Sequence, residues 1–186
     1  MLGVALKEWA AVCEALASGR QIVLIRKGGI ADAGGVFSPD HERFWLFPTY
    51  FHQQEEQLKP DAAPFWRNAL VARTDDATVP LTHFAEVAEV LRVDDLERLS
   101  KIDDHHLWAP ETVEKRFHYR TPGLFVMLLR VYEVEGAHRI ENRPEYDGCK
   151  SWVELGAELP TESPVPVVAD EPFAARMGEI KQRLQG

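Results

Sequence analysis

The sequence is poor in cysteine and has no long apolar segment. Its two cysteines, Cys13 and Cys149, lie far apart in the chain and form no Cys-x-x-Cys pair. A disulfide framework normally uses more cysteines in a shorter chain, so two reduced thiols are expected. No run approaches the roughly 18 apolar residues that a membrane-spanning helix needs. These absences predict a cytoplasmic protein that does not use a membrane as a partner.

Basic residues are also in the minority. The chain has 21 lysines and arginines against 30 aspartates and glutamates, which gives a formal net charge of -9. A polyanion such as DNA is repelled by the overall field of such a protein. A role in nucleic-acid binding would therefore require a local basic patch. The length of 186 residues and the hydrophobic content of 45% suit one sizeable core.

The glycine-rich phosphate loops of nucleotide-binding proteins are missing, because "RKGGIADAGG" has the glycines at the wrong spacing. At its start, Arg26 and Lys27 leave an apolar strand, and Gly28 and Gly29 expose backbone N–H groups. This combination can hold a phosphate or a carboxylate. The alternative is a polar strand exit with solvated charges and a tight turn. Both interpretations stay open.

Apolar residues recur at intervals of three and four over residues 4–19, which predicts a helix that ends at Gly19. Residues 21–26 and 43–50 are predicted strands, the second ending near Pro48. The glycine-rich residues 27–42 between them predict an exposed loop. Residues 51–59 suit a short helix.

Further along, residues 81–93 fit either type, and their valines favour a strand. Residues 94–102 suggest a helix capped by Asp94 or Asp95. Residues 109–117, with Pro110 in the first turn, predict another helix. Residues 123–134 are apolar on both alternating sets, as in a central strand that is buried on both faces. The chain ends with a proline-rich segment and a helix over residues 173–184.

Strands scattered among helices without a βαβ rhythm predict an α+β fold. Its sheet is expected to be mixed and mostly antiparallel, either open or curled into a small barrel of the PUA-like kind, and flanked by helices. We assign residues 1–157 to a single globular domain. The proline-rich segment and C-terminal helix of residues 158–186 are expected to pack on this domain or on a partner.

Two histidine regions can be interpreted in more than one way. His52 and Gln53 follow the strand that contains Thr49, and a histidine there can act as a base, bind a metal or read a nucleobase edge. The alternative is a histidine satisfied by a neighbouring backbone group. The segment "DDHHLW" gathers carboxylates and imidazoles, but adjacent residues fit no established metal-binding spacing. A solvated loop with His106 or Trp108 tucked inward explains it equally well. No metal site is therefore predicted, and a cofactor is left unknown.

The segments "LKEWAAVCEAL", "GRQIVLIRKGGI", "RFWLFPTYFHQ", "HHLWAPETVEKRF" and "YDGCKSWVEL" resemble the bacterial domain-of-unknown-function family 1802, over about residues 5 to 157. Some relatives carry an Mrr-type endonuclease domain, so the resemblance implies a link to restriction-modification systems. More distantly, "SGRQIVLIRKG" is similar to the first helix and strand of PUA-like barrels, which are typically nucleic-acid readers. No role is known for the matching positions, which are Arg26, Lys27, Gly28, Gly29, Pro48, Thr49, His52, Gln53, His106, Trp108, Arg116, Gly148, Cys149, Ser151 and Trp152.

Together these features favour a nucleic-acid-binding module that recognises DNA or RNA in a cleft, in a restriction-modification or defence context with a separate nuclease as a further partner. No catalytic residue is assigned. One alternative is a metal-dependent hydrolase or nuclease that uses His52, His106 and nearby aspartates, and another is a protein-interaction subunit that docks through its C-terminal helix. The oligomeric state is not predicted. The predicted ligand-binding residues are Arg26, Lys27, Gly28, Gly29, Thr49, His52, Gln53, His106, Trp108 and Arg116.

Overall fold

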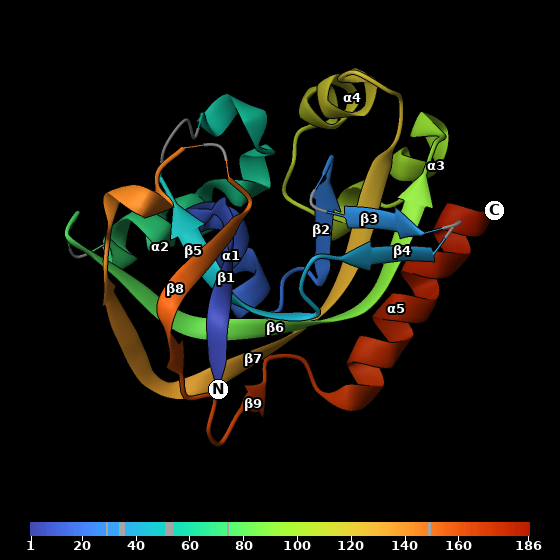
Figure 1. Cartoon of the computed structure of the whole chain (residues 1–186). Coiled ribbons are helices and arrows are strands. Elements are labelled where there is room, and N and C mark those ends of the chain that lie inside the picture. Colours follow the sequence, from blue (N-terminus) through green and yellow to red (C-terminus); the bar gives the residue numbers. More distant parts are fainter. Residues whose placement is uncertain (29, 34–35, 51–53, 74, 149) are drawn as a thin grey trace.

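A long, bent pair of antiparallel strands organises the fold (Figure 1). The computed structural model describes residues 1–28, 30–33, 36–50, 54–73, 75–148 and 150–186, with the backbone alone over 30–38. Strand β6 (Thr78–Val93) pairs antiparallel with β7 (Leu124–Glu141) along almost their whole length. The ladder shifts register between Leu81 and His83 and again between Val87 and Glu89. Such bulges bend a strand and increase its twist, so this pair of strands curves strongly.

The other strands extend the sheet from both sides of this central pair of strands, in the order β2-β7-β6-β5-β1-β8. Their bounds are β1 Leu2–Trp9, β2 Val23–Arg26, β5 Arg43–Thr49 and β8 Trp152–Leu159, while the short β9 (Val165–Pro166) also pairs with β7. Among the described strands, β1 and β5 are the one pair that runs parallel. The predicted α+β class with a mostly antiparallel sheet is confirmed. Among the described strands, β2 and β8 at the two ends of this order do not pair with each other, so the sheet is not closed into a barrel.

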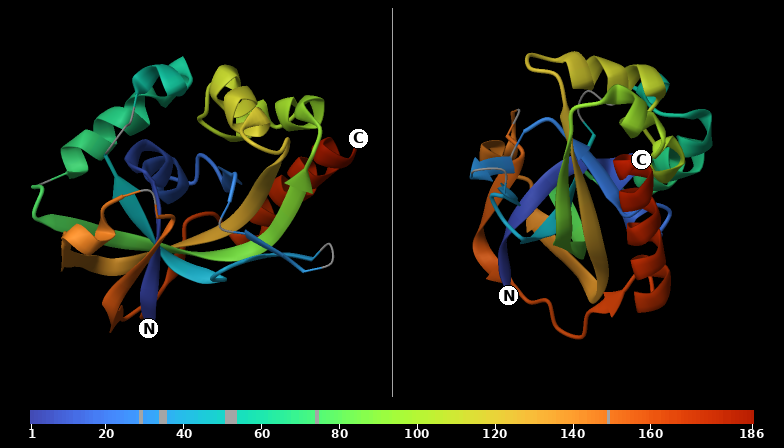
Figure 2. Two further views of the ribbon diagram at one scale, coloured as in Figure 1. Left: turned by 45° about the horizontal axis from the view of Figure 1, so that its top comes forward. Right: turned by 90° about the vertical axis from the view of Figure 1, so that its right-hand side faces the viewer.

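Helices and short turns cover the curled sheet. Figure 2 shows α2 and α4 at one end of the sheet and α5 along the side of the β6–β7 pair. The α-helices are α1 Ala10–Ala17, α2 Ala63–Ala72, α3 Leu96–Ser100, α4 Pro110–His118 and α5 Asp170–Gln185. The 3-10 turns are η1 Glu55–Gln57, η2 Pro60–Ala62, η3 Asp103–His105 and η4 Pro144–Tyr146. No helix in the described ranges is both long enough and apolar enough to cross a membrane.

The helix predicted over residues 4–19 is wrong in its first half, because residues up to Trp9 belong to β1 and α1 begins at Ala10. β1 lies between β5 and β8, and Ala5 and Leu6 are both buried although they point to opposite faces. A strand that is buried on both faces loses the alternation that would identify it. The spacing of Leu6, Trp9 and Cys13 therefore imitated a helical stripe across a strand–helix boundary.

The loop predicted over residues 27–42 is also wrong in part. A separate two-stranded sheet, β3 (Ile30–Ala33) with β4 (Val36–Pro39), lies inside it. Backbone pairing between the two short strands overrides the weak strand propensity of a glycine-rich segment. Most other patterns are confirmed: strands occupy the segments predicted at 21–26, 43–50, 81–93 and 123–134, and helices occupy those at 94–102, 109–117 and 173–184. Of the short helix predicted over residues 51–59, residues 51–53 lie outside the described residues, and residues 54–59 contain a 3-10 turn in place of an α-helix.

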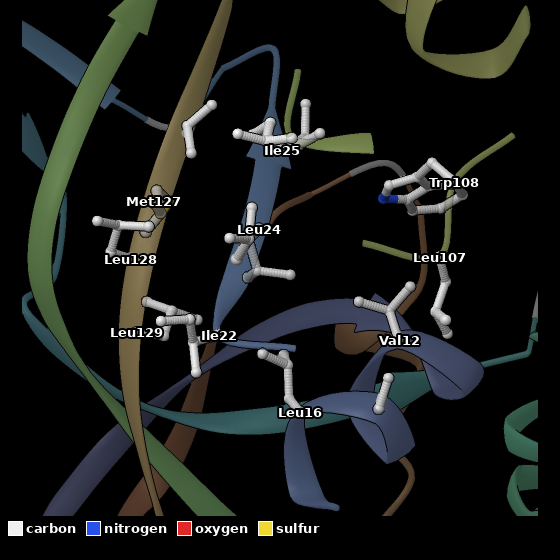
Figure 3. Packing of buried hydrophobic residues seen from close by; sticks show 14 of the residues in the cluster. Val12, Leu16, Ile22, Leu24, Ile25, Leu107, Trp108, Met127, Leu128 and Leu129 are labelled. Carbon is white, nitrogen blue, oxygen red and sulfur yellow. The ribbon is translucent and has the colours of Figure 1, made fainter. Parts of the chain in front are cut away.

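The main core lies between α1 and the concave side of the sheet. Figure 3 shows Val12 and Leu16 of α1 facing Leu24 of β2 and Leu129 of β7, with Trp108 at the edge of the same cluster. A second cluster on the other side of the sheet includes the buried aromatics Trp45 and Phe84, whose ring centroids lie 5.9 Å apart. Burial of large side chains on both sides of one curved sheet supplies the main stabilisation of the fold.

Helix α5 belongs to the main core. Ile180 is fully buried and Leu184 is 5% exposed. Arg176 donates to the carbonyl of Gly19, and the guanidinium of Arg130 lies 4.6 Å from the ring centroid of Phe173. We therefore expect the helix to contribute to the stability of the sheet that it covers.

Replacing Ile180 with alanine tests this. Ile180→Ala should lower the free energy of unfolding by about 2–5 kcal/mol, because it removes buried methyl groups and leaves a cavity. Urea denaturation would measure the change. The exposed Gln182→Ala on the same helix is the matched control and should alter stability by less than about 0.5 kcal/mol. Equal effects of the two substitutions would contradict the packing of α5.

Candidate functional site

A pocket of about 960 Å³ opens where β1, β2 and β5 end. Because β1 and β5 are parallel and in register, with Glu8 beside Pro48 and Trp9 beside Thr49, their carboxyl ends reach the same place. Strand β2 stands at one end of the sheet order and has three strands between it and β1. The segments that line the pocket are residues 7–9, 25–28, 47–50, 73, 75–76, 78–80, 116, 142, 146–148 and 150–151.

A buried carboxylate, that of Glu8, lines this pocket. The side chain of Glu8 is 6% exposed, and its Oε2 accepts a hydrogen bond of 3.1 Å from Nη1 of Arg26. Its Oε1 accepts the backbone N–H of Trp9 at 2.8 Å, and the hydroxyl of Thr49 donates to the Glu8 carbonyl at 3.2 Å. A buried charge is tolerated only when it is paired and hydrogen-bonded, and these contacts meet that need. The Glu8–Arg26 pair thus joins β1 to β2 across the curled sheet.

A stacked arginine lies beside this pair. The guanidinium carbon of Arg116, on α4, lies 3.6 Å from the ring centroid of Trp108. Trp108 is buried, and its ring contacts Trp9 edge-on with centroids 4.7 Å apart. Burial lowers the pKa of Arg116, the charge of Glu8 raises it and that of Arg26 lowers it, so these three charges act on one another. Arginine remains protonated in proteins in spite of such shifts.

Two lysines hold the walls of the pocket together. Lys27 donates to the carbonyls of Phe117, Thr121 and Gly123, which ties the end of β2 to the end of α4. Lys7 donates to the carbonyls of Tyr146 and Gly148, both at 2.6 Å, and so fixes the turn before β8. Both residues line the pocket, but these ammonium groups also have a structural role.

On the side of α2, the pocket is bounded by Tyr50 and Arg73. The Tyr50 hydroxyl donates to the carbonyl of Ala69 at 3.1 Å, and the Arg73 guanidinium lies 4.9 Å from the Tyr50 ring centroid. Burial raises the pKa of Tyr50, which keeps its hydroxyl protonated and able to donate. An aromatic face and a cation therefore meet at this wall.

The charge of the lining differs in sign from that of the whole chain. Among the described lining residues there are six basic and four acidic side chains, within a chain of net charge -9. The basic ones are Lys7, Arg26, Lys27, Arg73, Arg116 and Lys150, and the acidic ones are Glu8, Asp75, Asp76 and Asp147. Basic side chains therefore outnumber acidic ones among the described residues that line the pocket, in contrast to the chain as a whole.

The ten predicted ligand-binding residues fall into three groups. Five of them line the pocket: Arg26, Lys27, Gly28, Thr49 and Arg116. Trp108 and His106 are not among the lining residues, although Trp108 supports Arg116 from below. Gly29, His52 and Gln53 lie outside the described residues.

The sequence interpretation missed Glu8, Lys7 and Trp9, because it placed them on a helix. A charged pair inside an apolar segment was the available signal, since a buried charge in such a place needs a partner. Lys150, on the exposed rim, offered no local signal.

His106 has a structural position. Its side chain is 1% exposed, and its Nδ1 accepts the backbone N–H of Trp108 at 3.2 Å. Burial, with a smaller contribution from the charge of Lys59, lowers the pKa of His106 to about 3. The neutral ring thereby holds the loop that carries Trp108. Within the described ranges no three or more His, Cys, Asp or Glu side chains gather in a metal-binding group.

The buried neutral His106 predicts a loss of stability in acid. Between its folded pKa of about 3 and its ordinary value of 6.5, the unfolded chain binds a proton that the folded chain does not. Stability from this residue is therefore complete above pH 6.5 and falls by about 1.4 kcal/mol per pH unit below it. Urea unfolding at several pH values would measure the slope.

His106→Asn is the comparison that isolates this effect, because the asparagine carbonyl can still accept the N–H of Trp108. The variant should lose less stability than the wild type between pH 6.5 and pH 4. His83 and His105, whose pKa values burial also lowers, are present in both proteins and contribute to both pH profiles. Parallel pH profiles would show that His106 is not the group responsible.

Comparisons with known proteins identify the family of the chain. A family model described as Domain of unknown function (DUF1802) matches residues 5–179. The crystal structure of ASCH from Zymomonas mobilis is similar, with 15% identity, a TM-score of 0.48 and coverage of 82% of this chain and 86% of that one. A serine-to-alanine mutant and a tyrosine-to-phenylalanine mutant of the same protein match with 15% and 16% identity, the same TM-score and the same coverage of this chain, over 87% and 88% of theirs. No curated protein matches the chain.

Proposed function

This chain belongs to the DUF1802 family, whose description names no activity, and from the pocket itself we propose that the protein binds single-stranded nucleic acid by enclosing one nucleotide unit. The observation that supports the proposal is the net positive, aromatic-lined pocket in an otherwise acidic protein. Nucleic-acid binding depends largely on neutralising phosphates with lysine and arginine. The basic side chains of this chain that line the pocket provide those charges.

The size of the pocket favours a single unit over a duplex. A volume of about 960 Å³ is in the range of small-molecule and cofactor sites, which enclose a ligand and do not grip a long surface. A double helix would have to contact the rim only, whereas an unpaired nucleotide can enter. Proteins that bind single strands combine such basic grooves with aromatic side chains that stack on bases.

Four aromatic residues line the walls, namely Trp9, Phe47, Tyr50 and Tyr146. Trp9 and Tyr50 are both half-buried, so part of each ring remains accessible. A base that enters the pocket can stack on such a face irrespective of its identity. The acidic remainder of the surface would limit non-specific attraction of nucleic acid elsewhere. The separate nuclease partner and the restriction-modification link remain predictions of the family resemblance.

Salt dependence provides the test. Fluorescence anisotropy with labelled single-stranded and duplex oligonucleotides should show preferential binding of single strands, and the affinity should fall as salt rises. The logarithm of the binding constant should decrease by about 0.7 per phosphate contact for each unit of log salt concentration. Undetectable or salt-insensitive binding to DNA and RNA would sink the proposal.

A charge reversal at the rim localises the contact. Lys150 lines the pocket and is exposed, so Lys150→Glu should weaken single-strand binding and flatten the salt slope without disturbing the core. Lys101→Glu is the matched control, because Lys101 is exposed and does not line the pocket. Equal losses in the two variants would mean that the whole-protein charge, and not the pocket, governs binding.

A further inference from the structure

Two arginines share one corner of the pocket, but their donors are engaged differently. Nη1 of Arg26 donates to Glu8 Oε2 at 3.1 Å and to the Lys7 carbonyl at 3.4 Å. Arg116 makes no hydrogen bond and no ion pair with any residue in the described part of the chain, and is held by its stacking on Trp108 at 3.6 Å. Arg26 is thus partly committed to the protein, whereas the donors of Arg116 remain available.

Stacking holds an arginine in place without using its donors. The interaction engages the flat face of the guanidinium, while its five N–H donors point outward in the plane of the group. Arg116 is half-buried and lines the pocket. The N–H groups of its guanidinium that neighbouring residues do not cover are therefore exposed to the interior of the pocket. A polar group in such a place requires water or a ligand as its hydrogen-bond partner.

The support beneath Arg116 is rigid. Trp108 is 1% exposed, its ring contacts Trp9, and its backbone N–H is bound by the buried His106. Leu58 and Trp108 also form a β-bridge. The indole cannot turn away without opening the core, and a pre-positioned binding group loses little entropy when a ligand arrives.

The charges in this corner do not cancel. Glu8 is one carboxylate facing two guanidinium groups, and its oxygens already accept from Arg26 and from the Trp9 backbone. One positive charge is left over in a partly dehydrated site. A phosphate group complements it, because its oxygens accept the parallel donors of an arginine in bidentate geometry.

We infer that Arg116, stacked on Trp108, is the anchor for a phosphate group of the ligand, and that Arg26, oriented by Glu8, is a second donor to the same group. The inference rests on the proposed function in one respect: the phosphate would be that of the enclosed nucleotide unit. Lys27 does not share this role, since it donates to three carbonyls of the chain.

The test is a calorimetric titration of the full chain with inorganic phosphate and, separately, with a short single-stranded oligonucleotide. Arg116→Gln should weaken binding of both by about tenfold to a hundredfold, as the loss of a charged hydrogen-bonding group does. Arg116→Lys keeps the charge but not the planar fork, so it should give an intermediate loss. Circular dichroism would establish that both variants are folded, and Arg116→Lys retains the test if Arg116→Gln does not fold.

Arg120→Gln is the matched control. Arg120 also lies over an aromatic ring, with its guanidinium 5.1 Å from the centroid of the exposed Tyr119, but it does not line the pocket. Its replacement removes the same charge just beyond the same helix and should leave both titrations unchanged. A loss in Arg120→Gln as large as that in Arg116→Gln would overturn the assignment.

The two ligands separate the two proposals. If the wild type and Arg116→Gln bind the oligonucleotide equally, the anchor is wrong and the proposed function stands. If phosphate binds through Arg116 but no oligonucleotide binds, the anchor stands and the nucleic-acid proposal falls. If the wild type binds neither, both are wrong.

Discussion

The antiparallel pairing of β6 with β7 positions every other strand of the main sheet. β7 carries β2 and β9 on its free side, β6 carries β5, and β5 carries β1, which carries β8. The two register shifts in this ladder bend the β6–β7 pair, so that the strands at either side curve towards each other (Figure 1). If the β6–β7 pair were flat, the same pairings would leave β1 and β2 far apart, on opposite sides of the sheet. The pocket is therefore a consequence of curvature in the central pair.

The ion pair between Glu8 and Arg26 depends on this curvature. Its two residues belong to strands that have three others between them in the sheet order, yet the side chains meet at 3.1 Å. Removing either partner would leave the other as an unpaired buried charge. This destabilises a protein more than replacing both partners with apolar residues does. Lys27 adds a second connection, from the end of β2 to one carbonyl at the end of α4 and others just after it. Together they hold three separate parts of the chain around one cavity.

The arrangement gives an acidic protein a locally basic interior surface. Charges lining a concave site act on a ligand more strongly than charges spread over an exposed surface, because less solvent lies between them and the ligand. The indole of Trp108 has a part in this, since it fixes a guanidinium without neutralising it. A buried carboxylate beside two arginines then limits the excess positive charge to about what one phosphate oxygen neutralises.

Local sequence patterns were sufficient for α4 and α5, whose segments contain a helical period or a proline in the first turn, and for β2 and β7, whose uninterrupted apolar runs have the length of strands. They were misleading for β1, which is buried on both faces and borders directly on α1. The sequence also pointed to Arg26, Lys27, Thr49 and Arg116 as residues of one site. It could not assign their roles, because those depend on partners that are distant in the chain.

By itself, then, the sequence determined the fold class, the main core strands and the family, through hydrophobic periodicity and motifs that lie within single segments. Only the tertiary structure decided that Lys27 serves the backbone, that Arg26 serves Glu8, and that Arg116 rests on Trp108 with its donors available. The physical reason is that an ion pair or a stacking contact acts over a few ångströms in space. Which residues come that close is set by the curvature of the sheet and not by their separation in the chain.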